Sequence, residues 1–171
     1  SRAAPERVTA PLARARLCYD HLAGQVGVAL FDALVERDAL RLAPAATSSA
    51  RAGRAGPSAA VELGPAGEAL FTELGADVAE ARREKRRFAY ACVDWTERRP
   101  HLGGALGAAL CAAVVAHGWI MRQPATRAVI VTDAGVRALR ERFDIALGPE
   151  LSSGSTAARV GKHARTHEEA K

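Results

Sequence analysis

The chain contains an internal repeat, and this repeat limits the folds open to it more than any other feature. The decapeptide HLAGQVGVAL at residues 21–30 returns as HLGGALGAAL at residues 101–110, an offset of 80. Further along, VELGPAG at 61–67 corresponds to VIVTDAG at 129–135, now at an offset of 68. The shorter offset means that the first copy carries about twelve extra residues between the two blocks. Self-similarity of this kind is the signature of a duplicated structural unit. The sequence therefore predicts two copies of one unit.

The start of each unit has the pattern of two helices separated by a turn. In the first copy, apolar residues keep helical spacing over residues 12–22 and again over residues 28–36. Gly24 and Gly27 lie between these two stretches and interrupt the pattern. We therefore expect helix, turn, helix in this part of the unit.

The end of each unit has the pattern of a β-hairpin followed by a helix. In the second copy, the apolar runs 119–121 and 128–131 flank a polar tip at 122–127 that contains two arginines and a proline. Thr132 or Asp133 then caps a helix. Helix, helix, hairpin and helix is the order of a winged helix, with the hairpin as its wing.

The predicted fold is mainly α with short β-hairpins, an α+β arrangement of two winged-helix-like repeats joined by a long basic helix. The repeats span residues 10–75 and 92–146, and the linker helix spans residues 76–95, where nothing interrupts the helical pattern. Composition predicts three flexible parts. These are an N-terminal segment at 1–9, a mobile loop at 43–60 within the first unit, and a disordered tail at 147–171.

Composition narrows the class of protein without naming a function. The net charge of +5 permits a nucleic-acid partner but does not require one, and 25% charged residues exclude a wholly disordered chain. Cys18, Cys92 and Cys111 cannot form a paired disulfide framework and suit a reducing cytoplasm. The most apolar stretch, 102–120, is broken by four glycines and a histidine, so no membrane span is expected. The first residue is Ser rather than Met, and we expect a piece of a longer protein.

Three segments carry a resemblance to a known family: RLCYDHLAG at 16–24, LGPAGEALF at 63–71 and CVDWTERRPHLGG at 92–104. Over residues 12–147 the chain resembles the C-terminal part of a group of bacterial ArsR-type helix-turn-helix transcriptional regulators. The resemblance implies a cytoplasmic homodimer whose first winged-helix domain, upstream of the CYDH string, binds operator DNA. Only 17 residues precede that string here, so we expect that domain to be missing from this chain.

Two positions of the first unit depart from the pattern of that group. Its members commonly have Thr where this chain has Gly64, and Gly where it has Asp38. The first unit has therefore lost a helix cap and a helix-ending glycine. We expect it to be the less stable of the two copies.

Arginines and one lysine form the candidate DNA-contacting surface. Placed on the predicted linker helix, the basic run gives a double stripe that could follow DNA phosphates without reading bases. The alternative is a solvated helix on which Glu80 and Glu84 pair with arginines one turn away. The candidates are Arg82, Arg83, Lys85, Arg86 and Arg87 on this run and Arg122 and Arg127 at the hairpin tip.

The helices that would enter a DNA groove lack the chemistry to read bases. They lie at residues 28–35 and 105–115 and are apolar, with Asp32 and Glu36 where hydrogen-bond donors would be needed. These units are therefore expected to serve packing rather than base recognition. Specific DNA recognition must lie outside these 171 residues.

Cysteine and histidine recur together near the start of both copies and suggest a metal site. Cys18 and His21 are three residues apart, on one face of the predicted helix, and Asp20 adds an oxygen nearby. Cys92, Asp94 and His101 form a second set, in which Cys92 and His101 are the approximate counterparts of Cys18 and His21. Thiolate and imidazole ligands suit a divalent transition metal such as Zn, Cd, Ni or Co. A structural role fits equally well, with small buried cysteines and histidines that bond turn carbonyls. Both interpretations remain open at this point.

No motif for nucleophilic, phosphate-loop or zinc-protease chemistry occurs in the sequence, so an enzyme is not expected. We expect part of an ArsR-type regulator that contributes effector sensing, dimerisation and auxiliary contact to the DNA backbone, with DNA bound through the full-length protein. The alternative is an interaction module of two degenerate winged helices that binds no ligand.

Overall fold

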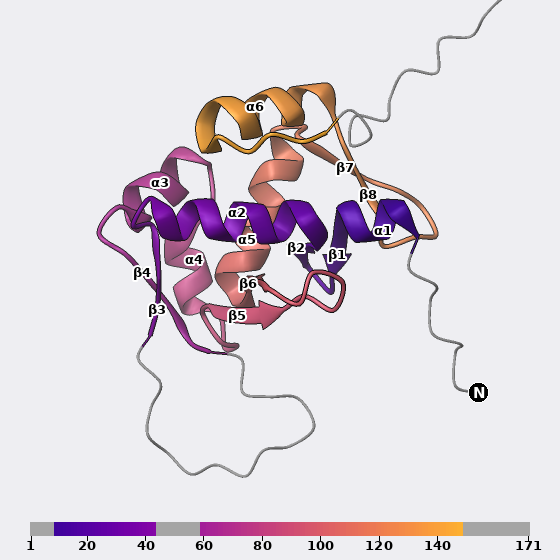
Figure 1. Ribbon diagram of the computed structural model, residues 1–171. Helices are drawn as coiled ribbons and strands as arrows, with labels where there is room; N and C mark the ends of the chain where they lie inside the picture. The colour runs from indigo at the N-terminus through magenta and orange to yellow at the C-terminus, as the bar shows by residue number, and fades with distance from the viewer. Residues whose placement is uncertain (1–8, 44–58, 149–171) are drawn as a thin grey trace, which may run out of the picture.

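The computed structural model describes residues 9–43 and 59–148, which form a mixed α/β fold (Figure 1). Within these ranges the strands pair two by two in sequence order, β1 with β2, β3 with β4, β5 with β6 and β7 with β8, which gives four two-stranded antiparallel sheets. The element order is α1 (Ala10–Arg14), β1 (Arg16–Cys18), β2 (His21–Ala23), α2 (Gly24–Glu36), β3 (Leu40–Leu42), β4 (Val61–Leu63), α3 (Gly67–Glu73), α4 (Val78–Arg83), β5 (Tyr90–Val93), β6 (Pro100–Gly103), α5 (Gly104–Ala116), β7 (Ile120–Arg122), β8 (Val129–Val131) and α6 (Asp133–Phe143).

The three parts predicted to be flexible, 1–9, 43–60 and 147–171, lie outside the described residues except at their inner edges. In the part of the chain that the structure describes, no helix is both long and apolar enough to cross a lipid bilayer.

The repeat is visible as two copies of hairpin, helix, hairpin and helix. The first copy consists of β1–β2, α2, β3–β4 and α3, and the second of β5–β6, α5, β7–β8 and α6. The helices α2 and α5 each have 13 residues, and they begin at Gly24 and Gly104. The 80-residue offset of the sequence repeat is therefore kept in three dimensions.

The helix predicted over residues 12–22 is wrong. α1 ends at Arg14, and the chain continues as the hairpin β1–β2, in which Cys18 pairs with His21. Tyr19 at the turn has a φ of 57°, a left-handed conformation that an α-helix cannot contain. Short apolar stretches fit strand and helix periods equally well, so their spacing could not separate the two. Each unit thus begins with a hairpin where the winged-helix order requires a helix.

The single basic helix predicted over residues 76–95 is also wrong. α4 ends at Arg83, Glu84 turns to extended backbone, and the chain enters strand β5 at Tyr90. The backbone of the segment after α4 bonds to the first repeat, with Ala91 N donating to Ala59 O at 2.8 Å and Val61 N to Ala89 O at 3.3 Å. Pairing with a distant strand has overridden the local helical pattern.

The end of the second copy is confirmed as predicted. Strands β7 and β8 pair as a hairpin, and the Thr132 side chain caps α6 by accepting a hydrogen bond from Gly135 N at 3.0 Å. The first copy has no side-chain cap on α3. Asp38 holds a φ of 54° where its counterpart Gly118 has 69°. The first copy therefore lacks the helix cap and the helix-ending glycine that the second copy has.

The second hairpin of each repeat is joined to the opposite repeat. Leu17 N in β1 donates to Arg127 O at 2.8 Å, and Val129 N in β8 donates to Ala15 O at 3.1 Å. In the same way, a β-bridge between Ala60 and Tyr90 joins β4 to β5. Hydrogen bonds therefore link β1–β2 with β7–β8, and β5–β6 with β3–β4.

The core is shared by both repeats. α2 packs on β6 and α5 packs on β2, so each long helix covers a hairpin of the other copy. Figure 1 shows α2 and α5 crossing at the centre, with β1–β2 and β7–β8 near one end of α2 and β3–β4 near the other. Buried apolar residues of both repeats form one continuous cluster.

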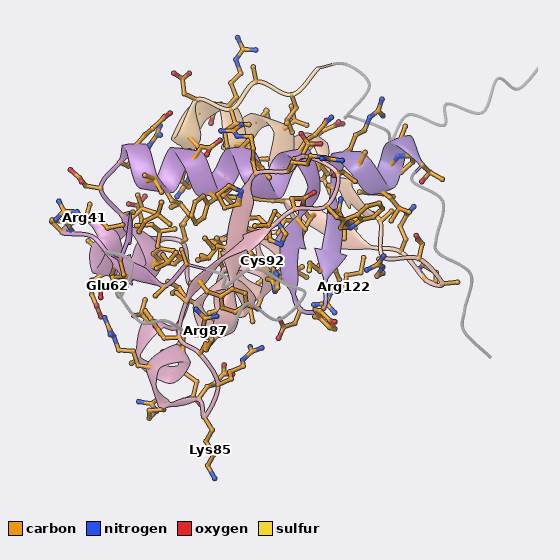
Figure 2. All side chains as sticks on the ribbon, turned by 60° about the horizontal axis from the view of Figure 1, so that its bottom comes forward. Arg41, Glu62, Lys85, Arg87, Cys92 and Arg122 are labelled. Carbon is orange, nitrogen blue, oxygen red and sulfur yellow. The ribbon has the colours of Figure 1, made fainter. Side chains whose placement is uncertain are left out.

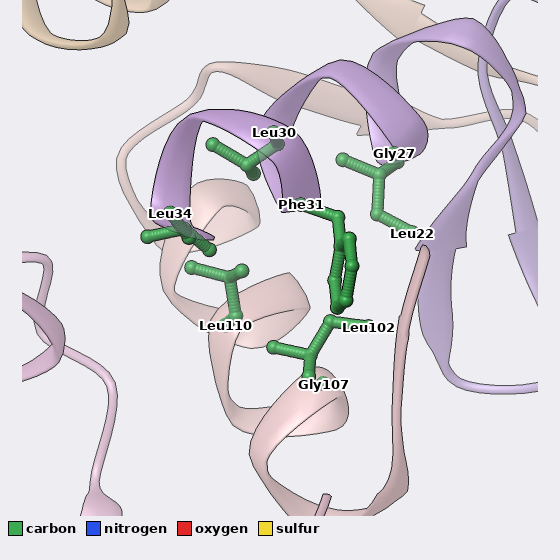
Figure 3. A pocket seen from close by; sticks show the side chains of 8 residues that line it. All are labelled: Leu22, Gly27, Leu30, Phe31, Leu34, Leu102, Gly107 and Leu110. Atoms are coloured by element: carbon green, nitrogen blue, oxygen red, sulfur yellow. The ribbon is translucent and has the colours of Figure 1, made fainter. Parts of the chain in front are cut away.

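Between the two crossing helices lies an apolar cavity of only about 10 Å³ (Figure 3). Such a space holds at most one water and offers it no polar partner. An effector larger than an atom therefore has no place there. The cavity is lined by Leu22, Gly27, Leu30, Phe31, Leu34, Leu102, Gly107 and Leu110.

Candidate metal centre

The same cysteine–histidine pair occurs in the first hairpin of each repeat. Cys18 pairs with His21 across the hairpin β1–β2, and Cys92 pairs with His101 across β5–β6. Directly opposed residues of antiparallel strands place their side chains on the same face of the sheet. The cysteine and histidine of each repeat are thus neighbours across a hairpin, not along a helix as the sequence predicted.

The two hairpins bring the four side chains together. Strand β2 contacts β6, and the Nε2 atoms of His21 and His101 lie 3.2 Å apart. One ligand atom from each of Cys18, His21, Cys92 and His101 lies within 4.8 Å of every other. Both histidines are buried, and both cysteines are half-buried. All four residues singled out in the sequence therefore converge at one point.

The donor set and its spacing fit a soft divalent ion. Two sulfurs and two imidazole nitrogens are ligands that Zn²⁺ and related ions prefer. Zn–N bonds of about 2.0 Å and Zn–S bonds of about 2.3 Å place tetrahedral ligand atoms about 3.3 to 3.8 Å apart. The 3.2 Å between the two Nε2 atoms is already close to that distance. Small side-chain shifts would complete a four-coordinate site.

A carboxylate lies close to Nδ1 of each histidine. Nδ1 of His101 lies 3.1 Å from Asp94 Oδ2, and Nδ1 of His21 lies 3.4 Å from Asp20 Oδ1. A carboxylate at Nδ1 holds the proton there and leaves Nε2 as the free donor atom for a metal. Arg86 in turn donates to Asp20 Oδ2. Each ring therefore has a carboxylate close to Nδ1, by a 3.4 Å hydrogen bond for His21 and by a 3.1 Å contact without hydrogen-bond geometry for His101.

Asp94 also ties the two repeats together. It is completely buried and accepts a hydrogen bond of 2.7 Å from Arg16. Burial alone would raise the pKa of Asp94, but hydrogen bonds from Gly24 N, Thr96 and Arg16 hold that pKa below its ordinary value. Asp94 is therefore a fixed negative charge beside His101. Its hydrogen-bond donors are Arg16 Nη2, Gly24 N, Thr96 N, Thr96 Oγ1 and Glu97 N.

The contact between the two thiols shifts their pKa values in opposite directions. A hydrogen bond from Cys92, followed by hydrogen bonds from His101 and His21, lowers the pKa of Cys18. The same contact with Cys18, together with burial, raises the pKa of Cys92. Of the two cysteines, Cys18 therefore has the lower pKa. A bound cation would favour the thiolate form of both.

Tyr90 connects the cluster to the surface. Its ring meets the edge of His21, with centroids 6.3 Å apart. Together with Arg86, Arg87 and Gly104, it lines an open hollow of about 380 Å³. This hollow is open to solvent on the outer side of Tyr90.

The basic residues proposed to contact DNA form no continuous stripe, because the helix that would carry them ends at Arg83. Arg83 pairs with Glu80 at 2.6 Å, and Arg86 pairs with Glu84 at 2.6 Å as well as with Asp20.

The other candidates differ in their surroundings. Arg82 stacks on Phe88, and Arg87 stacks on Tyr90. Lys85 points away from the fold, as Figure 2 shows. Arg122 and Arg127 are exposed on the hairpin β7–β8. Lys85, Arg122 and Arg127 therefore lie on the outer surface of the described fold.

Sequence reasoning missed the part played by Arg16 and underrated that of Asp94. Arg16 is completely buried and precedes Cys18 by two residues, while Asp94 follows Cys92 by two. The available signal was a charged residue two positions from each of these two cysteines. Nothing in the sequence showed that these two residues pair with each other across the repeats.

Comparison with known proteins gives one informative match. The chain is 36% identical over 131 residues to YdfF of Bacillus subtilis (strain 168), an uncharacterized HTH-type transcriptional regulator. The match covers 77% of this chain and 52% of the relative, so the chain spans about half the length of the protein it resembles. No protein-family profile and no solved structure matches the chain.

Proposed function

We propose that the chain is the effector-sensing region of a bacterial ArsR-type DNA-binding transcriptional regulator, and that its effector is a soft divalent transition-metal ion. The observation that carries the proposal is the convergence of four ligand atoms within 4.8 Å of one another. The regulatory role is supported by the 36% identity to a helix-turn-helix regulator. Because the chain spans about half of that relative, DNA binding by the whole protein is part of the proposal.

The four ligands have distinct tasks in this role. Cys18 and Cys92 supply two thiolates whose charge matches that of a divalent ion, and His21 and His101 complete the coordination through Nε2. Asp94 and Asp20 hold the rings in the orientation that presents Nε2.

The way in which metal binding would be transmitted depends on which hairpins supply the ligands. Two ligands belong to β1–β2 and two to β5–β6, so an ion links the hairpins of both repeats. Each of these hairpins is hydrogen-bonded to the wing of the other repeat. We propose that occupancy thereby fixes the positions of both wings in a homodimer, whose exposed Lys85, Arg122 and Arg127 add contacts to the DNA backbone. The winged-helix-like use of the two units is part of the same proposal.

A cobalt titration of the purified chain tests the metal site. Co²⁺ held by two sulfurs and two nitrogens should give intense visible d–d bands and a near-ultraviolet sulfur-to-metal band, saturating at one ion per chain. Cys18→Ser and His101→Gln should abolish these bands. Cys111→Ala and His117→Gln remove the same residue types elsewhere in the described fold and should keep them.

The outcome of the titration is decisive for the site. If the wild-type chain gives no bands, or if the two control variants lose them as fully as the ligand variants, the metal proposal is wrong. In that case an interaction module without a ligand is the better function. It is favoured by one observation: α2 and α5, which would have to enter DNA, are buried between the repeats.

A further inference from the structure

We propose that Cys18 and Cys92 also form a reversible disulfide, so that an oxidant of the peroxide class and a metal ion compete for the same two sulfurs. The inference deepens the proposed function and rests on it only for the competition with metal. The disulfide itself depends on the geometry of two cysteines.

The two sulfurs are placed for a cross-link between the repeats. They lie within 4.8 Å of each other. A disulfide bond of about 2.05 Å requires the sulfurs to approach by less than about 3 Å, and rotation about χ1 of each side chain is the motion that would bring them together. Cys18 ends β1 and Cys92 lies in β5, so the bond would join the hairpins that also carry the histidines.

Exposure separates this pair from the third cysteine. Cys18 and Cys92 are half-buried. Cys111 is completely buried in α5. An oxidant in solution therefore reaches the pair before it reaches Cys111. A reactive cysteine next to a second one that resolves it is the usual arrangement in redox-sensing proteins.

The chemistry balances with peroxide as the only co-reactant. One thiolate attacks an oxygen of hydrogen peroxide, the O–O bond breaks, and a sulfenic acid forms while the departing hydroxide takes a proton and leaves as water. The second thiol attacks the sulfenic sulfur, the S–O bond breaks, and a second water leaves. The two thiols lose two electrons in total and peroxide gains them. A dithiol reductant reverses the step by thiol–disulfide exchange.

Oxidation and metal binding exclude each other for a simple reason. A disulfide removes both thiolates and leaves only His21 and His101, and two ligands are too few for a closed transition-metal site. A bound ion in turn occupies the sulfur electrons that would attack peroxide. In a reducing compartment a disulfide of this kind is transient, as expected of a sensor.

Mass spectrometry of the oxidised chain tests the disulfide. We expect hydrogen peroxide to lower the mass of the metal-free Cys111→Ala variant by two hydrogen atoms and to remove both free thiols. Peptide mapping should join the peptides that contain residues 18 and 92, the product should remain the size of the untreated protein, and dithiothreitol should restore both thiols. Cys18→Ser and Cys92→Ser, each checked for folding by circular dichroism, should give no such mass loss.

Other products would overturn the proposal: covalent dimers, sulfinic acid without a cross-link, unchanged thiols, or, in the wild-type chain, a bond to Cys111. A second arm adds Zn²⁺ before peroxide and should slow thiol loss at least about tenfold. If Zn²⁺ fails to protect while the disulfide still forms, the metal function and the competition fail but the disulfide stands. If Zn²⁺ binds and no disulfide forms, the reverse holds.

Discussion

Arg16 donates a 2.7 Å hydrogen bond to Asp94, and both side chains are completely buried although they come from different repeats. Arg16 also donates to Leu12 O and to Thr96 Oγ1, and it stacks on Trp95. Charges removed from water are tolerated only when partners of this kind surround them. The pair therefore fixes the register of the two repeats beside the candidate metal centre.

Asp94→Asn should lower the free energy of unfolding by about 3 kcal/mol, because it leaves the buried charge of Arg16 without a partner. The substitution keeps the size of the side chain, so the loss reports the charge and not a cavity. Urea unfolding at neutral pH, followed by circular dichroism, measures it. A change below about 0.5 kcal/mol would mean that the pair contributes nothing net to stability.

The same variant predicts a change in how stability depends on pH. Hydrogen bonds hold the folded-state pKa of Asp94 below its ordinary value, so its contribution is fully present above the unfolded pKa of about 4 and is lost as pH falls through the lower folded value. Wild-type stability should therefore decline below about pH 4 more steeply than that of Asp94→Asn. Parallel curves for the two proteins over this range would contradict the assignment.

Gly107→Ala should lower the free energy of unfolding by about 1 to 3 kcal/mol, because the added methyl group has no room. A Cβ at this position would lie 2.4 Å from Leu102 O and 3.2 Å from the Cβ of His21. The backbone of β6 or strand β2, which carries His21, would have to move. Thermal unfolding compares this variant with Gly148→Ala, where a Cβ meets nothing within 4 Å and the midpoint should stay unchanged.

Asp38→Gly should stabilise the chain by about 0.5 kcal/mol, since glycine occupies the left-handed conformation at less cost than aspartate. Asp38 has a φ of 54° at the end of α2, and the exposed ion pair with Arg41 that would be lost contributes little. The melting temperature should rise. The reciprocal change in the second repeat, Gly118→Asp, should lower it, and a fall in both variants would refute the explanation.

DNA binding by the chain should be weak, independent of sequence and sensitive to salt. Fluorescence anisotropy across a salt series should show that combined Lys85→Ala, Arg122→Ala and Arg127→Ala reduces the slope of log K against log salt by up to about 2.7, or about 0.9 per lost phosphate contact. Arg83→Ala should leave the slope unchanged, because Glu80 already holds that guanidinium. Equal losses in the two variants would argue against the outer surface as the contact.

Metal binding should slow hydrogen exchange well away from the ligands. The amides of Leu17 and Val129 bond across the junction between β1–β2 and β7–β8. With Zn²⁺ at 100 times its dissociation constant, openings that release the ion should become about 100-fold rarer. Exchange of these two amides is measured with and without Zn²⁺. Protection confined to the ligand hairpins would show that the wings do not sense the ion.

The sequence predicted those parts of the fold that local signals determine. Thr132, the polar tip of β7–β8 and the periodicity of α6 each act within a few residues, and all three were identified. The segments 12–22 and 76–95 were misjudged because their conformation depends on distant strands: Leu17 bonds to Arg127, and Ala91 to Ala59. Periodicity within one segment cannot register a partner more than 30 residues away.

In the candidate site, too, local signals could be recognised from the sequence and contacts between distant segments could not. Residue type and repetition singled out Cys18, His21, Cys92 and His101, and those four residues converge. Their geometry was misjudged, because spacing of three residues fits both a helical turn and a two-residue hairpin. The orienting role of Asp94 depends on a ring 7 positions away in sequence and on Arg16 in the other repeat. Such a relationship becomes visible only when the chain is folded.

The junctions between the second hairpin of each repeat and the opposite repeat do not depend on an unbroken chain. The peptide bond after Lys85 lies between α4 and β5. The contacts that hold the repeats together lie elsewhere. They are the two hydrogen-bonded hairpin junctions, the pair of Arg16 with Asp94, and the shared core. Cutting the chain at this bond would leave all of these contacts in place. Two fragments, 1–85 and 86–171, would then form a complex that depends on concentration, because the cut removes only the high effective concentration of a covalent link. The two repeats are thus held together by the same kinds of contact that join the two subunits of a heterodimer, and the backbone link between them is additional.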